Sequence, residues 1–181
     1  IDFPLIIIAL GFAFLGLFDD LLGDKSSQGF KGHIKALLRG QLTTGGLKLF
    51  GGPAICVLAL SYFVSDLGYL TLFLNVITIS LIANLINLFD LAPGRSLKVS
   101  ILTIGICVAI VNTYSWQYGV LGILVMLLVL DLKEMMMLGD IGSNMIGSLV
   151  GFSIVQNASI NQTYIILGVV FCLTLLSEFV S

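Results

Sequence analysis

The chain has 181 residues, of which 58% are hydrophobic and only 10% are charged, and its formal net charge is −2. Soluble domains carry about 25% charged residues, so this chain has too few polar side chains to cover a water-soluble globule. The composition excludes a soluble domain and predicts an integral membrane protein, for which we expect no nucleic-acid partner.

Seven apolar runs follow one another along the chain, and crossing a bilayer takes about 20 apolar helical residues. They lie near residues 3–18, 46–65, 69–89, 98–113, 117–131, 142–156 and 162–180. We interpret each as a transmembrane helix. The predicted fold is all-α: a polytopic bundle of about seven helices in one membrane-embedded domain, residues 1–181. Since the chain lacks an initiator Met and stops within an apolar run, we expect a domain truncated at both ends.

The linkers at 19–45, 90–97 and 132–141 carry nearly all of the polar residues. If seven helices alternate in direction, these linkers fall on one face of the membrane. All cationic residues fall there as well: Lys25, Lys31, Lys35, Arg39, Lys48, Arg95, Lys98 and Lys133. The positive-inside rule therefore predicts that this face is cytoplasmic.

The first polar motif, Phe18-Asp19-Asp20-Leu21-Leu22-Gly23-Asp24, ends the first apolar run. Ionised groups at a bilayer edge are costly to bury, and three carboxylates repel one another unless a cation joins them. A solvated helix end is the plain alternative. The functional interpretation is a divalent metal site or a general base.

The second motif, Asn84-Leu85-Ile86-Asn87-Leu88-Phe89-Asp90, places a polar side chain at every third position. Such a stripe can simply join helices. Asp90 is followed by Pro93-Gly94-Arg95, however, which predicts an anion-binding Arg held in a turn beside a carboxylate.

The third motif, Leu138-Gly139-Asp140-Ile141-Gly142-Ser143-Asn144, begins a predicted helix with a glycine-rich turn. Asp140 could be only an N-cap, and small residues allow close helix packing. Free amides at a helix start also bind phosphate, and Asp140 could hold a bridging Mg²⁺.

A basic stretch runs from Lys31-Gly32-His33 through Arg39 to Lys48. Its cations could bind lipid headgroups or a diphosphate. His33 is the only histidine, and a lone histidine is more often structural. Thr43 and Thr44 are expected to cap the next helix. Acids, bases and a glycine-rich helix start on one face together suit a magnesium-assisted reaction on a phosphate ester.

Three segments of the chain resemble, in the same order, the motifs of the polyprenyl-phosphate N-acetylhexosamine-1-phosphate transferases. They are Asp19-Asp20, Asn84-x-x-Asn87-Leu88-x-Asp90 and Gly139-Asp140-x-Gly142-Ser143. This superfamily includes the phospho-MurNAc-pentapeptide translocase of peptidoglycan synthesis. The resemblance implies transfer of a sugar-1-phosphate from a UDP-amino sugar to polyprenyl (undecaprenyl) phosphate, with release of UMP. It further implies cell-envelope glycan synthesis at a bacterial plasma membrane.

The resemblance also implies residue roles. Asp19, Asp20 and Asp90 would be catalytic, with Asp19 the candidate base, and Asp140 with Asp20 would hold Mg²⁺, or alternatively Mn²⁺. Substrate contacts are expected from Lys31, His33, Asn84, Asn87, Arg95, Gly142 and Ser143. The acids should converge in one cleft. Pro93-Gly94-Arg95 and the segment 131–137 depart from the better-known members, which indicates a divergent branch and leaves the sugar open.

Three other classes remain as alternatives. An intramembrane prenyltransferase also uses Asp-rich motifs and Mg²⁺, but it needs two Asp-rich clusters. A CDP-alcohol phosphotransferase needs one continuous Asp-rich motif. A transporter would place its ionisable groups near mid-bilayer, often in broken helices. The polyprenol length and the oligomeric state, a homodimer included, stay open.

Overall fold

The computed structural model describes residues 2–23, 43–63, 68–110 and 115–180, and most of these residues lie in helices. The helices of this part of the chain are α1 (Phe3–Leu22), α3 (Thr44–Phe63), α4 (Tyr69–Phe89), α5 (Arg95–Ile110), α6 (Ser115–Leu132), α7 (Gly139–Asn157) and α8 (Ile160–Val180). The predicted all-α bundle of seven helices is confirmed. The helix bounds exceed several apolar runs because the helices continue into polar ends, as α1 does over Asp19 and Asp20.

Four helices of the described residues are long and apolar enough to cross a membrane: Phe3–Leu22, Thr44–Tyr62, Tyr69–Phe89 and Ser115–Leu132. By length and composition, the chain is therefore a membrane protein. α5, with 16 residues, is shorter than the rest, and α8 contains the shorter apolar segment Ile160–Leu176. Membrane-spanning helices also tolerate a proline such as Pro53 inside α3.

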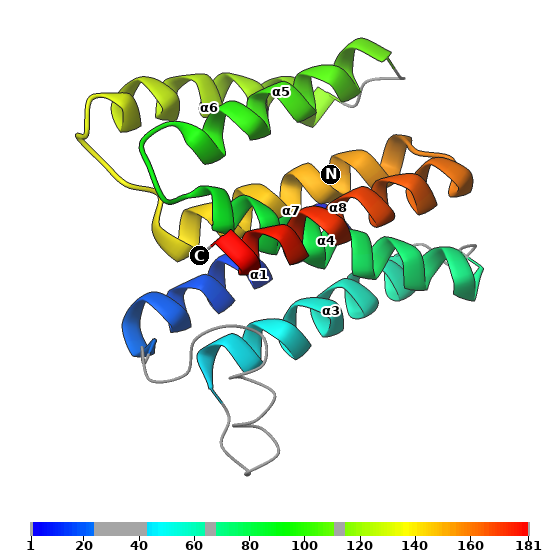
Figure 1. Cartoon of the computed structure of the whole chain (residues 1–181). Coiled ribbons are helices and arrows are strands. Elements are labelled where there is room, and N and C mark those ends of the chain that lie inside the picture. The colour runs from blue at the N-terminus through cyan, green and yellow to red at the C-terminus, as the bar shows by residue number, and fades with distance from the viewer. Residues whose placement is uncertain (1, 24–42, 64–67, 111–114, 181) are drawn as a thin grey trace.

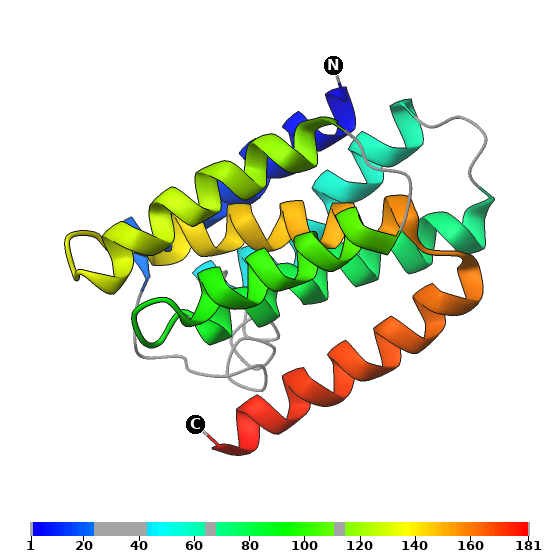
Figure 2. The same ribbon diagram turned by 90° about the horizontal axis from the view of Figure 1, so that it is seen from above.

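α7 is the central helix of the bundle and packs against α1 on one side and α4 on the other (Figures 1 and 2). Its buried residues include the consecutive runs 146–148 and 150–153, so every face of the helix contacts protein. Polar side chains such as Ser143, Ser148 and Ser153 are fully buried there. A helix enclosed by other helices needs no lipid-facing apolar surface. This explains why α7 is the least apolar of the helices that the structure describes.

Glycines allow α7 to approach its neighbours closely. A Cβ added at Gly147 would lie 2.7 Å from Cα of Ala83, and one at Gly151 would lie 2.9 Å from Cα of Ile79, both in α4. On the other side, a Cβ at Gly16 of α1 would collide with the backbone of Asp140. Small residues are the usual means of close helix contact in membranes, and here they fix α7 between α1 and α4.

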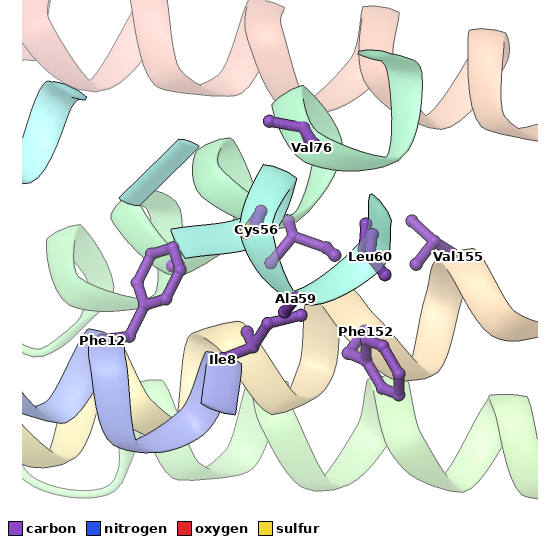
Figure 3. Close-up of a cluster of buried hydrophobic side chains, with 10 residues drawn as sticks. Ile8, Phe12, Cys56, Ala59, Leu60, Val76, Phe152 and Val155 are labelled. Atoms are coloured by element: carbon purple, nitrogen blue, oxygen red, sulfur yellow. The ribbon is translucent and has the colours of Figure 1, made fainter. Parts of the chain in front are cut away.

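Two apolar clusters complete the core. Figure 3 shows the first, in which α1, α3, α4 and α7 meet through Ile8, Phe12, Cys56, Ala59, Leu60, Val76, Phe152 and Val155. The second cluster joins α4, α5, α6, α7 and α8 around Ile86, Leu97, Ile104 and Leu124. In Figure 2, α8 slants away from the other helices toward its C-terminal end.

The helices alternate in direction, so that the ends of α1, α4 and α6 lie beside the starts of α3, α5 and α7 (Figures 1 and 2). We call this part of the bundle the acidic end. It carries Asp19, Asp20, Asp90, Asp131 and Asp140. The alternation expected from the sequence thus gathers the described residues of the three polar motifs at one end; Asp24 of the first motif lies outside them.

Gly147→Ala should lower the melting temperature of the detergent-solubilised protein, because the added methyl group meets the α4 backbone. Overpacking of this kind costs about 1–3 kcal/mol of the free energy of unfolding. Gly122→Ala in α6 is the matched control, since a Cβ there meets nothing within 4 Å. Equal melting temperatures for the two variants, measured by scanning fluorimetry, would contradict the close packing of α4 on α7.

Candidate functional site

Three charged side chains from three helices meet at the acidic end. The ammonium Nζ of Lys48 in α3 lies 2.6 Å from Oδ2 of Asp19 in α1 and 2.5 Å from Oδ2 of Asp140 in α7. The exposed fractions of the Lys48, Asp19 and Asp140 side chains are 17%, 24% and 29%. The Thr44 hydroxyl also donates a hydrogen bond to Asp19. We call Asp19, Lys48 and Asp140 the charged triad.

With both acids ionised, the triad carries one more negative than positive charge. The two carboxyl groups lie close enough to share a hydrogen bond when one of them carries a proton, and the single ammonium between them is their only cationic contact among the described residues. Partial burial strengthens electrostatic interactions relative to bulk water. The arrangement therefore favours a cation between Asp19 and Asp140.

Asp20 has a different position from its neighbour. Its Oδ1 accepts a hydrogen bond from the backbone N–H of Asp140, and its Oδ2 accepts one from the N–H of Ile141, both at 3.1 Å. The first N–H groups of a helix have no partner within the helix and carry a partial positive charge. Asp20 of α1 thus caps α7 across the helix interface.

Local backbone features bring Asp20 to this position. Gly139 has a φ of +62°, in the left-handed region that favours glycine, and turns the chain into α7. A Cβ on Gly139 would lie 3.2 Å from Oδ2 of Asp20, tighter than an ordinary contact. The glycines at positions 16 and 139 therefore allow the α1 carboxylates to reach the first turn of α7.

Hydrogen bonds tie the first turns of α7 to α4. The Ser143 hydroxyl lies 2.6 Å from Oδ1 of Asn87 in α4 and 2.7 Å from the carbonyl oxygen of Gly139. The side-chain amide of Asn144 donates to the carbonyl of Asp140 at 2.6 Å. These contacts orient the backbone that carries Asp140.

A second pair of carboxylates lies where α4, α5 and α6 meet. Oδ1 of Asp90 accepts a hydrogen bond from the Ser96 hydroxyl at 2.6 Å, and Oδ2 of Asp131 accepts one from the N–H of Gly94 at 2.6 Å. Burial, and then the charge of Asp131, raise the pKa of Asp90, while the Ser96 hydrogen bond opposes the shift. Asp131 is only 4% exposed. Its carboxylate holds the turn between α4 and α5.

The structure brings some of the predicted site residues together and separates others. Asp19, Asp20 and Asp140 converge. Asp90 accepts a hydrogen bond from Ser96 instead, and within the described residues no ion pair joins it to this group.

The remaining predicted substrate-binding residues make no hydrogen bond or ion pair with the triad among the described residues, or lie outside those residues. Asn84 and Arg95 are exposed, and no ion pair joins Arg95 to Asp90 within the described ranges. The Gly142 amide donates to the carbonyl of Leu138 and is used within the helix. Lys31 and His33 lie in segment 24–42, outside the described residues.

The predicted magnesium site can be compared with the metal-binding side chains that the structure brings together. Among the described residues, no three carboxylate, imidazole or thiol groups are arranged to hold a metal ion. Mg²⁺ is, however, commonly bound by one or two carboxylates together with water and substrate phosphates. The pair of Asp19 and Asp140, which already surrounds an ammonium, fits that pattern. Since both oxygens of Asp20 accept backbone amides, Asp19 is the neighbour of Asp140 that faces the cation.

Two residues of this region were not among the predicted site residues. Lys48 was grouped with the basic stretch 31–48 although it lies in α3, and Asp131 was noted only as a departure from the family motif. A signal for both was present in the sequence. Each is a charged residue adjoining a long apolar segment, and such residues normally need a partner.

A surface hollow lies at the opposite end of the bundle. Its volume is about 420 Å³, and it is lined by Asp2, Leu5, Ile6, Ser115 and Trp116. It contains a single charged side chain and none of the grouped carboxylates. The charged triad is therefore the better candidate site.

Asp20→Ala should increase hydrogen exchange at the amides of Asp140 and Ile141, because both lose their acceptor. The expected loss in free energy of unfolding is about 0.5–2 kcal/mol, the usual cost of losing a helix cap. Asp2→Ala is the matched control, because Asp2 precedes α1 and its side chain makes no capping hydrogen bond. Unchanged exchange at these amides, measured by mass spectrometry, would contradict the capping role.

Asp90→Asn should become increasingly stabilising as the pH rises. The raised pKa means that the folded protein holds the Asp90 proton more tightly than the unfolded chain does. The resulting stabilisation is present below the unfolded pKa and is lost as the pH rises through the folded pKa. The Asn oxygen can still accept the Ser96 hydroxyl. Melting temperatures of the two proteins should therefore separate increasingly as the pH rises above the ordinary aspartate pKa of about 4. Curves that stay parallel over the whole pH range would exclude the shift.

Comparisons with protein-family models, with curated proteins and with solved structures gave no match to this chain. The grounds for assigning a function are therefore the residues of the acidic end and their contacts.

Proposed function

We propose that the protein is a membrane-embedded transferase that moves a sugar-1-phosphate from a UDP-amino sugar to a polyprenyl phosphate and releases UMP. The observation that carries this proposal is the charged triad, in which two carboxylates from separate helices surround one cation at the end of a membrane bundle. The order of the three sequence motifs supports it. A bacterial plasma membrane, with the acidic end in the cytoplasm, is part of the proposal.

Position along the bundle supports chemistry on a lipid headgroup. The triad lies at the end of α1, at the start of α7 and in the first turns of α3, where a phosphate on a membrane lipid and a water-soluble nucleotide can meet. Both substrates are anionic, so the reaction brings like charges together. Catalysis of phosphoryl transfer depends mainly on positioning and on charge neutralisation.

Asp140 and Asp19 would hold Mg²⁺ in this proposal. When bound there, Mg²⁺ would neutralise phosphate oxygens and polarise the phosphorus that is attacked. Asp20 holds the first turn of α7 and thereby the position of Asp140. Lys48 supplies a further positive charge for the substrate phosphates.

The proposed step is a displacement at phosphorus. An oxygen of the polyprenyl phosphate forms a bond to the phosphorus that carries the sugar, and the bond from that phosphorus to the UMP oxygen breaks. A phosphate monoester is already largely ionised at neutral pH, because its second pKa is near 6. The nucleophile therefore needs orientation more than deprotonation, and Asp19 acts through the cation rather than as a strong base.

Asp140→Asn should lower UMP release by about a hundredfold or more. Metal ions supply several kcal/mol of transition-state stabilisation, and each 1.4 kcal/mol corresponds to about tenfold in rate. The assay uses membranes containing the protein, undecaprenyl phosphate, Mg²⁺ and a panel of UDP-sugars that begins with UDP-GlcNAc. Asp2→Asn, at the opposite end of the bundle, is the control.

Two results would overturn the proposal. One is the absence of UMP release from the wild-type protein with every sugar of the panel. The other is normal turnover in Asp140→Asn, which would remove the metal assignment.

A further inference from the structure

We propose that Lys48 is an internal counter-ion that occupies the divalent-cation position between Asp19 and Asp140, and that it is released toward the substrate phosphate when that position is filled. This inference rests on the proposed function and deepens it. It assigns to Lys48 a role in coupling the binding of the cation to the binding of the phosphate substrate.

The geometry places the ammonium where a bridging cation belongs. Nζ of Lys48 is within 2.6 Å of one oxygen from each carboxylate, and these oxygens come from helices whose backbones are held by independent contacts. Gly16 fixes the approach of α1 to α7, and Asp20 fixes the start of α7. The two carboxylates therefore stay together whichever cation lies between them.

Lys48 and a divalent cation cannot share this position. Three positive charges within contact distance of two carboxylates would leave a net positive charge in a half-buried site, and like charges at such distances repel strongly. Binding of the divalent ion must displace the ammonium. Removing the ammonium should accordingly strengthen divalent-ion binding.

The Lys48 side chain is able to move. Lysine is a compact charge on a flexible four-carbon stem, and Lys48 lies in the second turn of α3, which begins at Thr44. Its side chain is 17% exposed, so a path to solvent exists. Once released from the carboxylates, the ammonium is a cation at the acidic end that can pair with a phosphate.

This arrangement predicts an order of events. With Lys48 held by Asp19 and Asp140, a phosphate substrate would meet two carboxylates and no available triad cation. A divalent cation that fills this position neutralises the two carboxylates and at the same time frees the Lys48 ammonium. Because coupling between two ligands is reciprocal, the divalent cation and the phosphate should each strengthen binding of the other, and Lys48 should carry much of that coupling.

The first test measures Mn²⁺ binding by electron paramagnetic resonance on the purified protein in detergent. Lys48→Met should bind Mn²⁺ more tightly than the wild type, by about tenfold or more, because the competing charge is gone. Lys98→Met is the matched control, since Lys98 is an exposed cation of α5 that makes no ion pair within the described ranges. Equal or weaker Mn²⁺ binding by Lys48→Met overturns the inference.

The second test uses the wild-type protein and does not depend on the folding of a variant. Acylation of Lys48 by a water-soluble amine reagent is followed by mass spectrometry with and without Mn²⁺. Labelling of Lys48 should rise several-fold when Mn²⁺ is added, while labelling of Lys98 in the same sample stays constant. Unchanged or reduced labelling of Lys48 in the presence of bound Mn²⁺ overturns the inference.

The two tests separate this inference from the proposed function. If Mn²⁺ binds the wild type but Lys48→Met shows no gain, only the role of Lys48 fails. If Mn²⁺ binds neither protein, the cation position itself is wrong, and the inference fails together with the proposed function.

Discussion

Enclosure of α7 by other helices is the constraint on which the acidic end depends. Because Gly147 and Gly151 bring α7 against α4, and Gly16 brings it against α1, the start of α7 has a fixed position relative to both neighbours. Asp140 lies in that first turn. A lipid-facing α7 could not carry so many polar side chains, and a looser α7 would not hold Asp140 within reach of Lys48.

The charges at the acidic end then determine what each carboxylate contacts. Two carboxylates in a partly buried place repel each other unless a cation lies between them, and Lys48 is that cation here. Asp20, although adjacent to Asp19, is neutralised in another way, by the amides at the start of α7. Two neighbouring aspartates of one motif therefore have separate tasks, because successive positions on a helix point in directions about 100° apart.

The arrangement bears on the alternative classes. A transporter of the broken-helix type places ionisable groups near the bilayer centre, whereas the grouped carboxylates of the described residues lie at one end of continuous helices. The interior does contain polar contacts, such as the hydrogen bond from Gln117 to Ser153 at 2.6 Å, but neutral pairs of this kind join membrane helices. These features favour chemistry at the membrane surface.

Composition and the spacing of apolar runs determined the all-α membrane bundle, the alternation of its helices and the presence of Asp19, Asp20 and Asp140 at one end, because these properties depend on length and hydropathy alone. Only the tertiary structure decided which acid faces the cation, that Asp20 caps α7, and that Lys48 joins three helices. The tertiary structure also places Asp90 in a hydrogen bond with Ser96 and leaves the side chains of Asn84 and Arg95 exposed. Such pairings depend on the rotation of each helix about its axis, which close glycine contacts between distant segments set.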